Sequence, residues 1–244
     1  MPKFADMNTI KVAGGGNFQF SAIRPDKLGA TEYTLVTIVV DTSSSVDAFK
    51  DELLSCIKAV VAGCQRNPRA DNLMVRLMTF NSHRQEIHGF VPLRQLQADQ
   101  YAPLKCQGMT ALYDATYDAL TATVTYAEQL SQYNLAVNAA IYILTDGEDN
   151  ESKIAPSLIA KEMQRITHQE SLESLVSVLV GVNTSQASVT GYLQMFKDEA
   201  KLSQYVDIAD ATPATLAKLA AFVDKSIRAQ SIALGTGTAG YLGF

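Results

Sequence analysis

The stretch YTLVTIVVDTSSS, residues 33–45, joins an apolar run to one carboxylate and a cluster of hydroxyl groups. The run before the carboxylate is almost entirely apolar or β-branched, which is typical of a strand buried on both faces of a parallel sheet. Beyond the serines the apolar residues follow helical spacing, so the stretch predicts a strand that ends at Asp41 and turns into a helix. Taken alone, Ser44 or Ser45 is more simply interpreted as a cap of that helix than as part of a ligand site. Asp47 would be the reciprocal capping partner.

The rest of the chain alternates between strand-like and helix-like segments. Strands are predicted at 17–23, 33–40, 73–80, 85–91, 138–144, 175–182 and 205–208, and helices at 46–66, 108–133, 156–168, 189–202 and 213–232. The tight turn at 81–84 makes 85–91 antiparallel to 73–80. This order predicts an α/β fold with a doubly wound, mostly parallel central sheet, one antiparallel edge strand and helices on both faces.

The length of 244 residues and the hydrophobic content of 47% suit one large core. We expect a single domain at 33–232, preceded by an N-terminal extension at 1–32 and followed by a Gly-rich tail at 233–244. Within the extension, the glycines at 14–16 are expected to form a turn. No strand precedes them and no phosphate-binding pattern follows.

Charge and cysteine content exclude several classes of protein. The net charge is -5 and there is no run of Lys or Arg, so we expect no nucleic acid and no membrane surface as partner. Residues 1–10 lack the apolar core of a signal peptide and no run is long enough to span a bilayer, so a cytoplasmic location is expected. Cys56 and Cys64 are too far apart along one predicted helix to form a disulfide, and with Cys106 they are expected to be free thiols.

A second predicted strand, 138–144, also runs into a carboxylate, in Thr145-Asp146-Gly147. Parallel strands of an open sheet end at the same edge, where such folds bind ligands. If the two strands are neighbours, Asp41 and Asp146 face each other. Two like charges at about 4 Å repel by roughly 4 kcal/mol at an effective dielectric of 20, which favours a cation between them.

Hydroxyl groups complete the candidate metal site. Ser43 and Ser45 follow the first carboxylate, and Thr110 stands where the predicted helix 108–133 opens. An all-oxygen set without His or Cys suits a hard ion, and Mg²⁺, with Mn²⁺ or Ca²⁺ as alternatives, is favoured over Zn²⁺.

Asp-x-Ser-x-Ser at 41–45, the helix-opening Thr110 and Thr-Asp-Gly at 145–147 together resemble the metal-ion-dependent adhesion site (MIDAS) of von Willebrand factor A (vWA) domains. The resemblance covers about residues 33–230. It implies that Ser43, Ser45 and Thr110 bind the ion directly, and that Asp41 and Asp146 hold it mainly through water.

The resemblance also implies a protein-interaction module, not an enzyme. An Asp or Glu side chain of a partner protein would displace an exchangeable water and complete the coordination of the cation. The expected member is of the prokaryotic or phage type and intracellular, with an AAA-type ATPase or an assembly component as partner. The oligomeric state is left open.

The alternative class is a Mg²⁺-dependent phosphatase or phosphotransferase that forms an aspartyl phosphate on Asp41. That chemistry needs a second acid two residues after the nucleophile, where this chain has Ser43, so binding is favoured over catalysis. No Gly-x-Ser-x-Gly motif is present, and His83, His88 and His168 are expected at the surface or in turns.

Two groups of residues near the motifs have open interpretations. Glu148, Asp149 and Glu151 are more simply a solvated acidic loop than a rim that tunes the site. Asn81 and His83 follow the predicted strand 73–80. The sequence favours a position at the same edge of the sheet as Asp41 no more than a position elsewhere.

Overall fold

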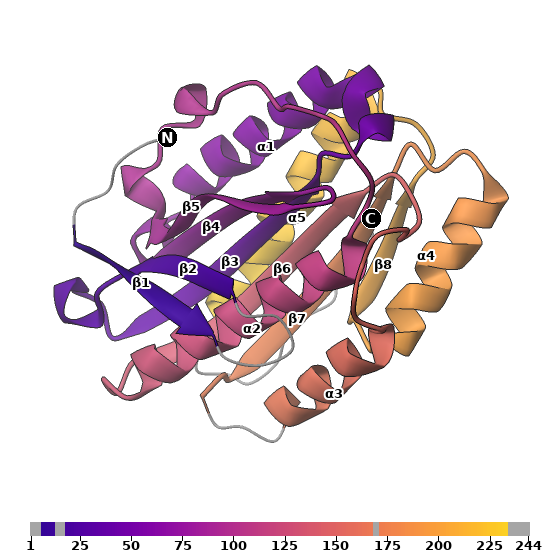
Figure 1. Ribbon diagram of the computed structural model, residues 1–244. Helices are drawn as coiled ribbons and strands as arrows, with labels where there is room; N and C mark the ends of the chain where they lie inside the picture. The colour runs from indigo at the N-terminus through magenta and orange to yellow at the C-terminus, as the bar shows by residue number, and fades with distance from the viewer. Residues whose placement is uncertain (1–5, 13–17, 168–170, 234–244) are drawn as a thin grey trace.

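The computed structural model describes residues 6–12, 18–167 and 171–233 (Figure 1). The predicted glycine turn, His168 and the Gly-rich tail beyond its first residue, Ala233, lie outside these residues. The described strands are β1 Met7–Val12, β2 Phe18–Ile23, β3 Glu32–Asp41, β4 Leu73–Phe80, β5 Arg84–Pro92, β6 Ala136–Thr145, β7 Ser174–Val182 and β8 Gln204–Ile208. The described α-helices are α1 Lys50–Gln65, α2 Leu112–Ser131, α3 Pro156–Thr167, α4 Ala187–Glu199 and α5 Pro213–Ala233.

All described strands belong to one sheet, in the order β1-β2-β5-β4-β3-β6-β7-β8. The central strands β4, β3, β6, β7 and β8 pair in parallel, and β5 is antiparallel to β4. The predicted α/β fold with a mostly parallel sheet is confirmed. The antiparallel strand does not lie at the edge, however, because β2 pairs with β5 and β1 pairs with β2.

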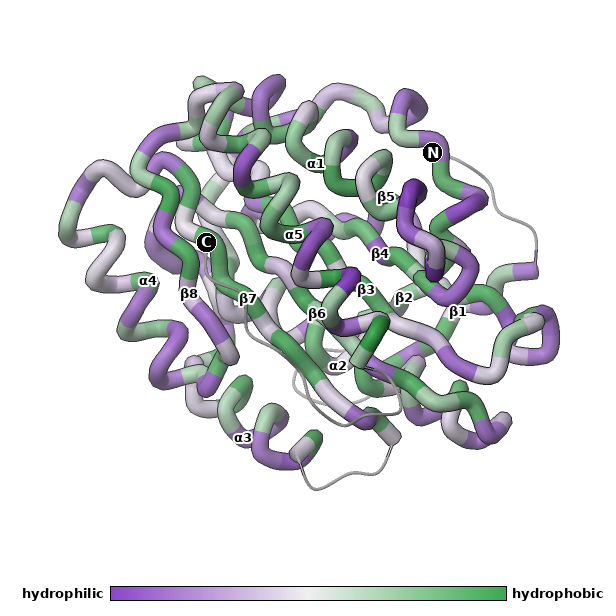
Figure 2. The backbone as a smooth tube through the Cα atoms, turned by 180° about the vertical axis from the view of Figure 1, so that it is seen from behind, coloured by the Kyte–Doolittle hydropathy of each residue, from purple (hydrophilic) through white to green (hydrophobic). Residues whose placement is uncertain are grey.

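The helices cover both faces of this sheet. One core contains α1 and α5 together with Val36, Ile38 and Val40 of β3. The other contains α2, α3 and α4 together with Leu35 and Val39. Since successive side chains of a strand point to opposite faces, the unbroken apolar run of β3 feeds both cores. Figure 2 shows hydrophobic residues concentrated along the central strands and hydrophilic ones on outer helices such as α4.

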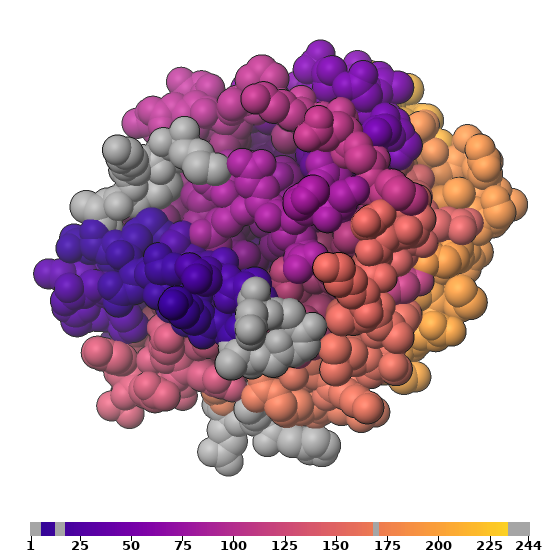
Figure 3. All heavy atoms as spheres, in the orientation of Figure 1, coloured from indigo at the N-terminus to yellow at the C-terminus, as the bar shows by residue number. Residues whose placement is uncertain are grey.

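The hairpin of β1 and β2 packs closely against the rest of the sheet. Its atoms, indigo in Figure 3, are continuous with those of the neighbouring elements. One register pair, Ala22 with Phe90, joins β2 to β5. At Gly89 the strands approach so closely that an added Cβ would lie 1.8 Å from the backbone oxygen of Ser21. The part of the predicted extension that the structure describes is therefore built into the central sheet, while the boundary at residue 33 stays a prediction.

Two further expectations concern single side chains. His88 was expected at the surface or in a turn and is instead 4% exposed within β5, because that strand is covered by the segment that follows it. Cys56, Cys64 and Cys106 are free thiols, as predicted. None of the described helices combines the length and the apolar character needed to cross a bilayer.

Candidate metal centre

Asp41 ends β3 and is fully buried. Its Oδ1 accepts a hydrogen bond from the Ser43 backbone N–H at 2.7 Å, and its Oδ2 accepts one from the Thr145 hydroxyl at 2.6 Å. Burial, with a smaller contribution from the negative charge of Asp146, raises the pKa of Asp41 to about 6, although the hydrogen bonds from Thr145 and Ser43 act to lower it. The carboxylate is therefore held in one orientation in a place where its negative charge is unfavourable unless a cation is near.

A chain of hydroxyl groups connects the end of β3 to the end of β6. The Ser43 and Ser45 hydroxyl oxygens are 3.1 Å apart, and the Ser45 hydroxyl donates to Asp146 Oδ1 at 2.8 Å. The register pairs Val40 of β3 with Leu144 of β6, so the two strands end at the same level. The two carboxylates predicted to meet across neighbouring strands thus lie at one edge of the sheet. Burial raises the pKa of Asp146 as well.

The interpretation of the serines as a helix cap is wrong. The 3-10 helix Ser44–Phe49, which precedes α1, has no side-chain cap hydrogen bond. The Ser44 hydroxyl donates instead to the Gly108 carbonyl at 3.1 Å, and the Ser44 backbone N–H donates to the same oxygen at 3.1 Å. This serine therefore attaches the loop after β3 to the segment before α2.

Thr110 lies in that segment, because α2 begins at Leu112 and not at the predicted residue 108. The segment is fastened at both ends: the Gln107 N–H donates to the Thr42 carbonyl at 2.9 Å, and the Ala111 N–H donates to the Asn81 carbonyl at 3.1 Å. Gly108 has a positive φ of 76°, which lets the chain turn here. Thr110 itself is 4% exposed, so these contacts hold it beside the loop that contains Ser43.

The acidic loop after Asp146 caps α2 from a distant part of the chain. Asn150 Oδ1 accepts from the Thr110 N–H at 2.8 Å, Asp149 Oδ1 accepts from the Tyr113 N–H at 3.3 Å, and the Ser152 hydroxyl accepts from the Asp114 N–H at 3.0 Å. The residue at the N-cap position of α2, Ala111, supplies no side-chain bond. Asp149 is therefore a structural anchor, whereas Glu148 and Glu151 are exposed, as expected for a solvated loop.

Sequence reasoning missed this capping role. Asp, Asn and Ser are the residue types that cap helices, and their presence at 149–152 was the available signal. It was not recognisable as capping because the helix they cap lies about 40 residues earlier. The contacts join the loop of Asp146 to the segment of Thr110.

Asn150→Ala is expected to weaken Mg²⁺ binding by about three- to tenfold, because the Thr110 N–H loses its acceptor. The bond from the backbone N–H of residue 150 to the Thr110 carbonyl, at 3.0 Å, is retained. The free energy of unfolding should fall by about 1 kcal/mol with the lost cap. Calorimetric Mg²⁺ titration and urea unfolding measure the two effects. Glu151→Ala, one residue further along and exposed, is the control. Equal Mg²⁺ affinity of the two variants would contradict the role of Asn150.

Other buried charges in the neighbourhood are already paired. Arg84 binds Asp114 at 3.0 Å and Asp118 at 2.6 Å, and Arg76 binds Glu86 at 3.0 Å. Among the described residues, none of the ion pairs includes Asp41 or Asp146. Within the part of the chain that the structure describes, these two carboxylates therefore have no cationic side chain as partner.

The donor set fits a hard divalent cation. Two carboxylates and the hydroxyl groups of Ser43, Ser45 and Thr110 supply only oxygen atoms, which Mg²⁺ prefers. Within the described ranges, no three His, Cys, Asp or Glu side chains gather as a metal site, so hydroxyl groups have to supply part of any coordination here. Asp41 and Ser43 are buried while Ser45 is exposed, so the set opens toward solvent.

The sequence matches no protein-family model and no curated protein. Solved structures do match. The PilB minor pilin from Streptococcus sanguinis has a TM-score of 0.58 at 16% identity over 89% of this chain and 66% of that one. The pilus adhesin SpaC from Lactobacillus rhamnosus GG has a TM-score of 0.57 at 10% identity over 92% of this chain and 35% of that one.

A third match is proximal thread matrix protein 1 from the mussel byssus, in a structure whose MIDAS motif is occupied by zinc. Its TM-score is 0.53 at 18% identity over 80% of this chain and 46% of that one. The chain thus spans between 35% and 66% of the length of these three proteins. At these identities the matches are evidence of fold alone: the described residues share their α/β fold with these three proteins.

Proposed function

We propose that this chain is a metal-dependent protein-interaction module. Its cation, held by Asp41, Ser43, Ser45, Thr110 and Asp146, would bind an Asp or Glu carboxylate of a partner protein. The observation that carries the proposal is the pair of carboxylates at the ends of β3 and β6, which lie at the same level beside hydroxyl groups and form no ion pair with a described residue.

The protein groups have separable roles in this mechanism. When bound, the cation would supply a Lewis-acid position for a carboxylate oxygen. Asp41 supplies negative charge from a fixed orientation, because the Ser43 N–H and the Thr145 hydroxyl hold its two oxygens. Ser43 and Ser45 supply neutral oxygens, which leave the cation with unneutralised charge for an acidic ligand.

The surroundings of the site also suit a protein partner. Met109, next to Thr110, is 46% exposed, which places a large apolar side chain at the rim. Exposed apolar groups beside a polar anchor are common where proteins bind one another. The AAA-type ATPase partner and the cytoplasmic location stay predictions from the sequence.

The phosphatase alternative has less support. A nucleophilic aspartate has to reach the phosphorus atom of a substrate, and Asp41 is fully buried with both oxygens hydrogen-bonded. Ser43, in the position where that chemistry needs an acid, donates its backbone N–H to Asp41. Binding is therefore the function that we propose.

The proposal is tested by selecting random displayed peptides on the immobilised protein in Mg²⁺ and eluting them with EDTA. Eluted peptides are expected to share an Asp or Glu, and changing it to Asn or Gln should abolish capture. The Asp41→Asn protein should capture none of them. Peptides that stay bound in EDTA and bind both proteins equally would refute a metal-dependent mode.

Mg²⁺ affinity is expected to fall about tenfold between pH 7 and pH 5, because the cation has to displace a proton from Asp41, whose pKa is about 6 in the folded protein. The metal-free protein should show the opposite trend. The folded pKa exceeds the ordinary value of 3.8, so the stability due to Asp41 is complete below pH 3.8 and is lost as the pH rises through 6.

Calorimetric titration and urea unfolding at pH 5 and 7, each with and without Mg²⁺, measure both trends. Asp41→Asn should remove the pH dependence that this residue causes. An Mg²⁺ affinity that is constant between pH 5 and 7 would contradict proton competition at Asp41.

A further inference from the structure

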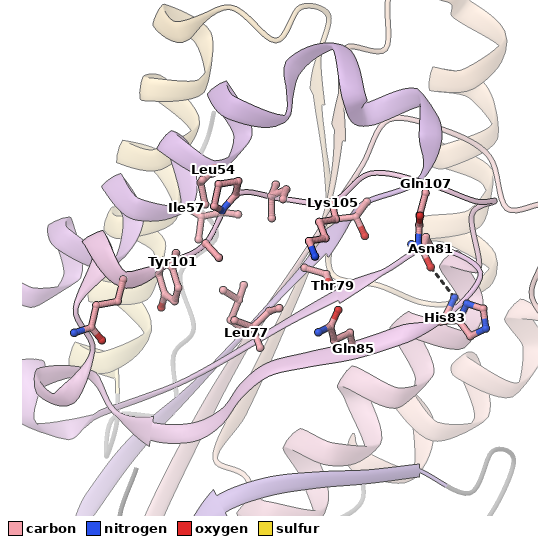
Figure 4. Close-up of a pocket in the computed structure, with 16 residues that line it drawn as sticks. Leu54, Ile57, Leu77, Thr79, Asn81, His83, Gln85, Tyr101, Lys105 and Gln107 are labelled. Carbon is pink, nitrogen blue, oxygen red and sulfur yellow. Dashed lines mark hydrogen bonds between the residues drawn. The ribbon is translucent and has the colours of Figure 1, made fainter. Parts of the chain in front are cut away.

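A cavity of about 470 Å³ lies on the α1 face of the sheet, beside the candidate metal centre. Figure 4 shows it between β4, β5, α1 and the segment 100–107. None of the five candidate metal-site residues lines it, although Thr42, between two of them, does. Its volume is within the range of about 300–1,000 Å³ that is usual for small-molecule sites.

One end of the cavity is an apolar wall that is already ordered. Ile57 of α1 and Leu77 of β4 are 2% and 4% exposed, and Tyr101 is 6% exposed. The Tyr101 hydroxyl lies 3.0 Å from Nε2 of His88, and the two rings are stacked at 5.9 Å. Buried His88 therefore holds the aromatic ring in place, so a ligand would meet a wall that needs no rearrangement.

The middle of the cavity carries hydrogen-bond donors instead. Thr79 is 6% exposed, and its hydroxyl has no hydrogen bond to another described residue. In Figure 4 the Lys105 side chain extends over the cavity toward Thr79. Within the described part of the chain, Lys105 forms no ion pair. Gln85 adds an amide beside them.

The charge of the cavity differs from that of the whole protein. The chain has a net charge of -5, yet among the described residues the cavity is lined by Lys105 and by no Asp or Glu. A cation and a cavity-lining hydroxyl that forms no hydrogen bond to another described residue, next to an apolar wall, are complementary to an anion that has an apolar body.

We propose that this cavity binds a small organic carboxylate with an apolar or aromatic body. The carboxylate would accept hydrogen bonds from Lys105 and Thr79, and the apolar body would pack against Ile57, Leu77 and Tyr101. This site is independent of the cation, so it adds a ligand to the proposed interaction module.

The test is a calorimetric titration of the whole chain in EDTA, which prevents carboxylates from binding through a cation. The probes are 4-phenylbutyrate, 4-phenylbutanol and acetate. Phenylbutyrate is expected to bind with a Kd below about 1 mM, the alcohol at least fivefold more weakly, and acetate not measurably. Failure of phenylbutyrate to bind, or equal binding of the alcohol, would overturn the proposal.

Two variants locate the binding. Lys105→Gln should weaken phenylbutyrate about fivefold and leave the alcohol unchanged, and Ala102→Trp, at an exposed position of the lining, should block both. Lys161→Gln and Ala187→Trp, exposed on α3 and α4 across the sheet, are the matched controls. Binding to Ala102→Trp as tight as to the unaltered protein would place the ligand elsewhere.

A final measurement distinguishes between two ligands for the cavity: a free small molecule and the C-terminus of a partner protein. The peptide Gly-Gly-Gly-Gly-Phe presents a carboxylate and a phenyl ring, separated by one carbon fewer than in phenylbutyrate, at a free C-terminus. Weaker binding of the peptide than of phenylbutyrate supports a small molecule. Peptide binding that is tenfold tighter would overturn that assignment and identify the C-terminus of a partner protein as the ligand.

Discussion

Asp41→Asn is expected to lower Mg²⁺ affinity at least about 100-fold and, in the same protein, to raise the stability of the metal-free state. The loss of affinity follows because the buried anionic charge disappears. The gain in stability follows because at pH 7.5 the unaltered carboxylate is ionised at a site that raises its pKa to about 6 from 3.8. Such a shift lowers the free energy of unfolding of the metal-free protein by a value on the order of 3 kcal/mol.

The amide group that replaces the carboxylate in Asp41→Asn should restore part of that lost stability. Its oxygen can still accept from the Ser43 N–H, and the Thr145 hydroxyl can rotate to accept from its NH₂ group. We therefore expect an increase of about 1–2 kcal/mol in the free energy of unfolding, measured with urea in EDTA at pH 7.5. The opposite signs of the two effects are typical of functional residues that are held at a cost to stability.

Asp47→Asn is the matched control, since Asp47 is an exposed carboxylate in the 3-10 helix that follows β3 and is paired with Lys50 at 2.7 Å. Asp47→Asn should change neither the Mg²⁺ affinity nor the stability of the metal-free protein measurably. If Asp41→Asn bound Mg²⁺ as tightly as the control variant does, the cation would have to be held elsewhere, and the proposed function would lose its basis.

Gly89→Ala is expected to destabilise the fold by about 3 kcal/mol, at the upper end of ordinary overpacking. An added Cβ would lie 1.8 Å from the Ser21 oxygen and 2.3 Å from the Ser21 carbonyl carbon. Both are backbone atoms, so relief requires β2 to move as a whole. Phe20 and Ala22, which are 1% exposed on β2, would then lose part of their packing.

Urea unfolding measures the change in stability, and amide hydrogen exchange should show selective loss of protection in β1 and β2. Gly29→Ala is the control, because a Cβ at Gly29 meets nothing within 4 Å. That variant should differ from the unaltered protein by less than about 0.5 kcal/mol. Identical unfolding midpoints for the two variants would show that the hairpin does not depend on the glycine.

The sequence predicted the central strands well because their signal is local. An uninterrupted apolar run such as 33–40 has one simple interpretation, and β3 is indeed buried along its length from Tyr33 to Asp41. The strand β1 gave no such signal, since Met7–Val12 is half-exposed at the edge of the sheet. The burial of His88 was missed for a related reason. The segment that covers β5 is irregular, so it has no periodic pattern from which its position over the strand could be predicted.

The sequence by itself determined the fold class, the helices and strands of the core, and the residue types at the candidate metal centre. Each of these depends on neighbours along the chain: periodicity, or a polar group at the end of an apolar run. Only the tertiary structure decided that Ser44 binds the Gly108 carbonyl instead of capping a helix, and that residues 149–152 cap α2. It alone placed Lys105 over Thr79. These contacts join segments that are far apart in the chain, and their partners are set by how the helices and strands pack, which no local pattern records.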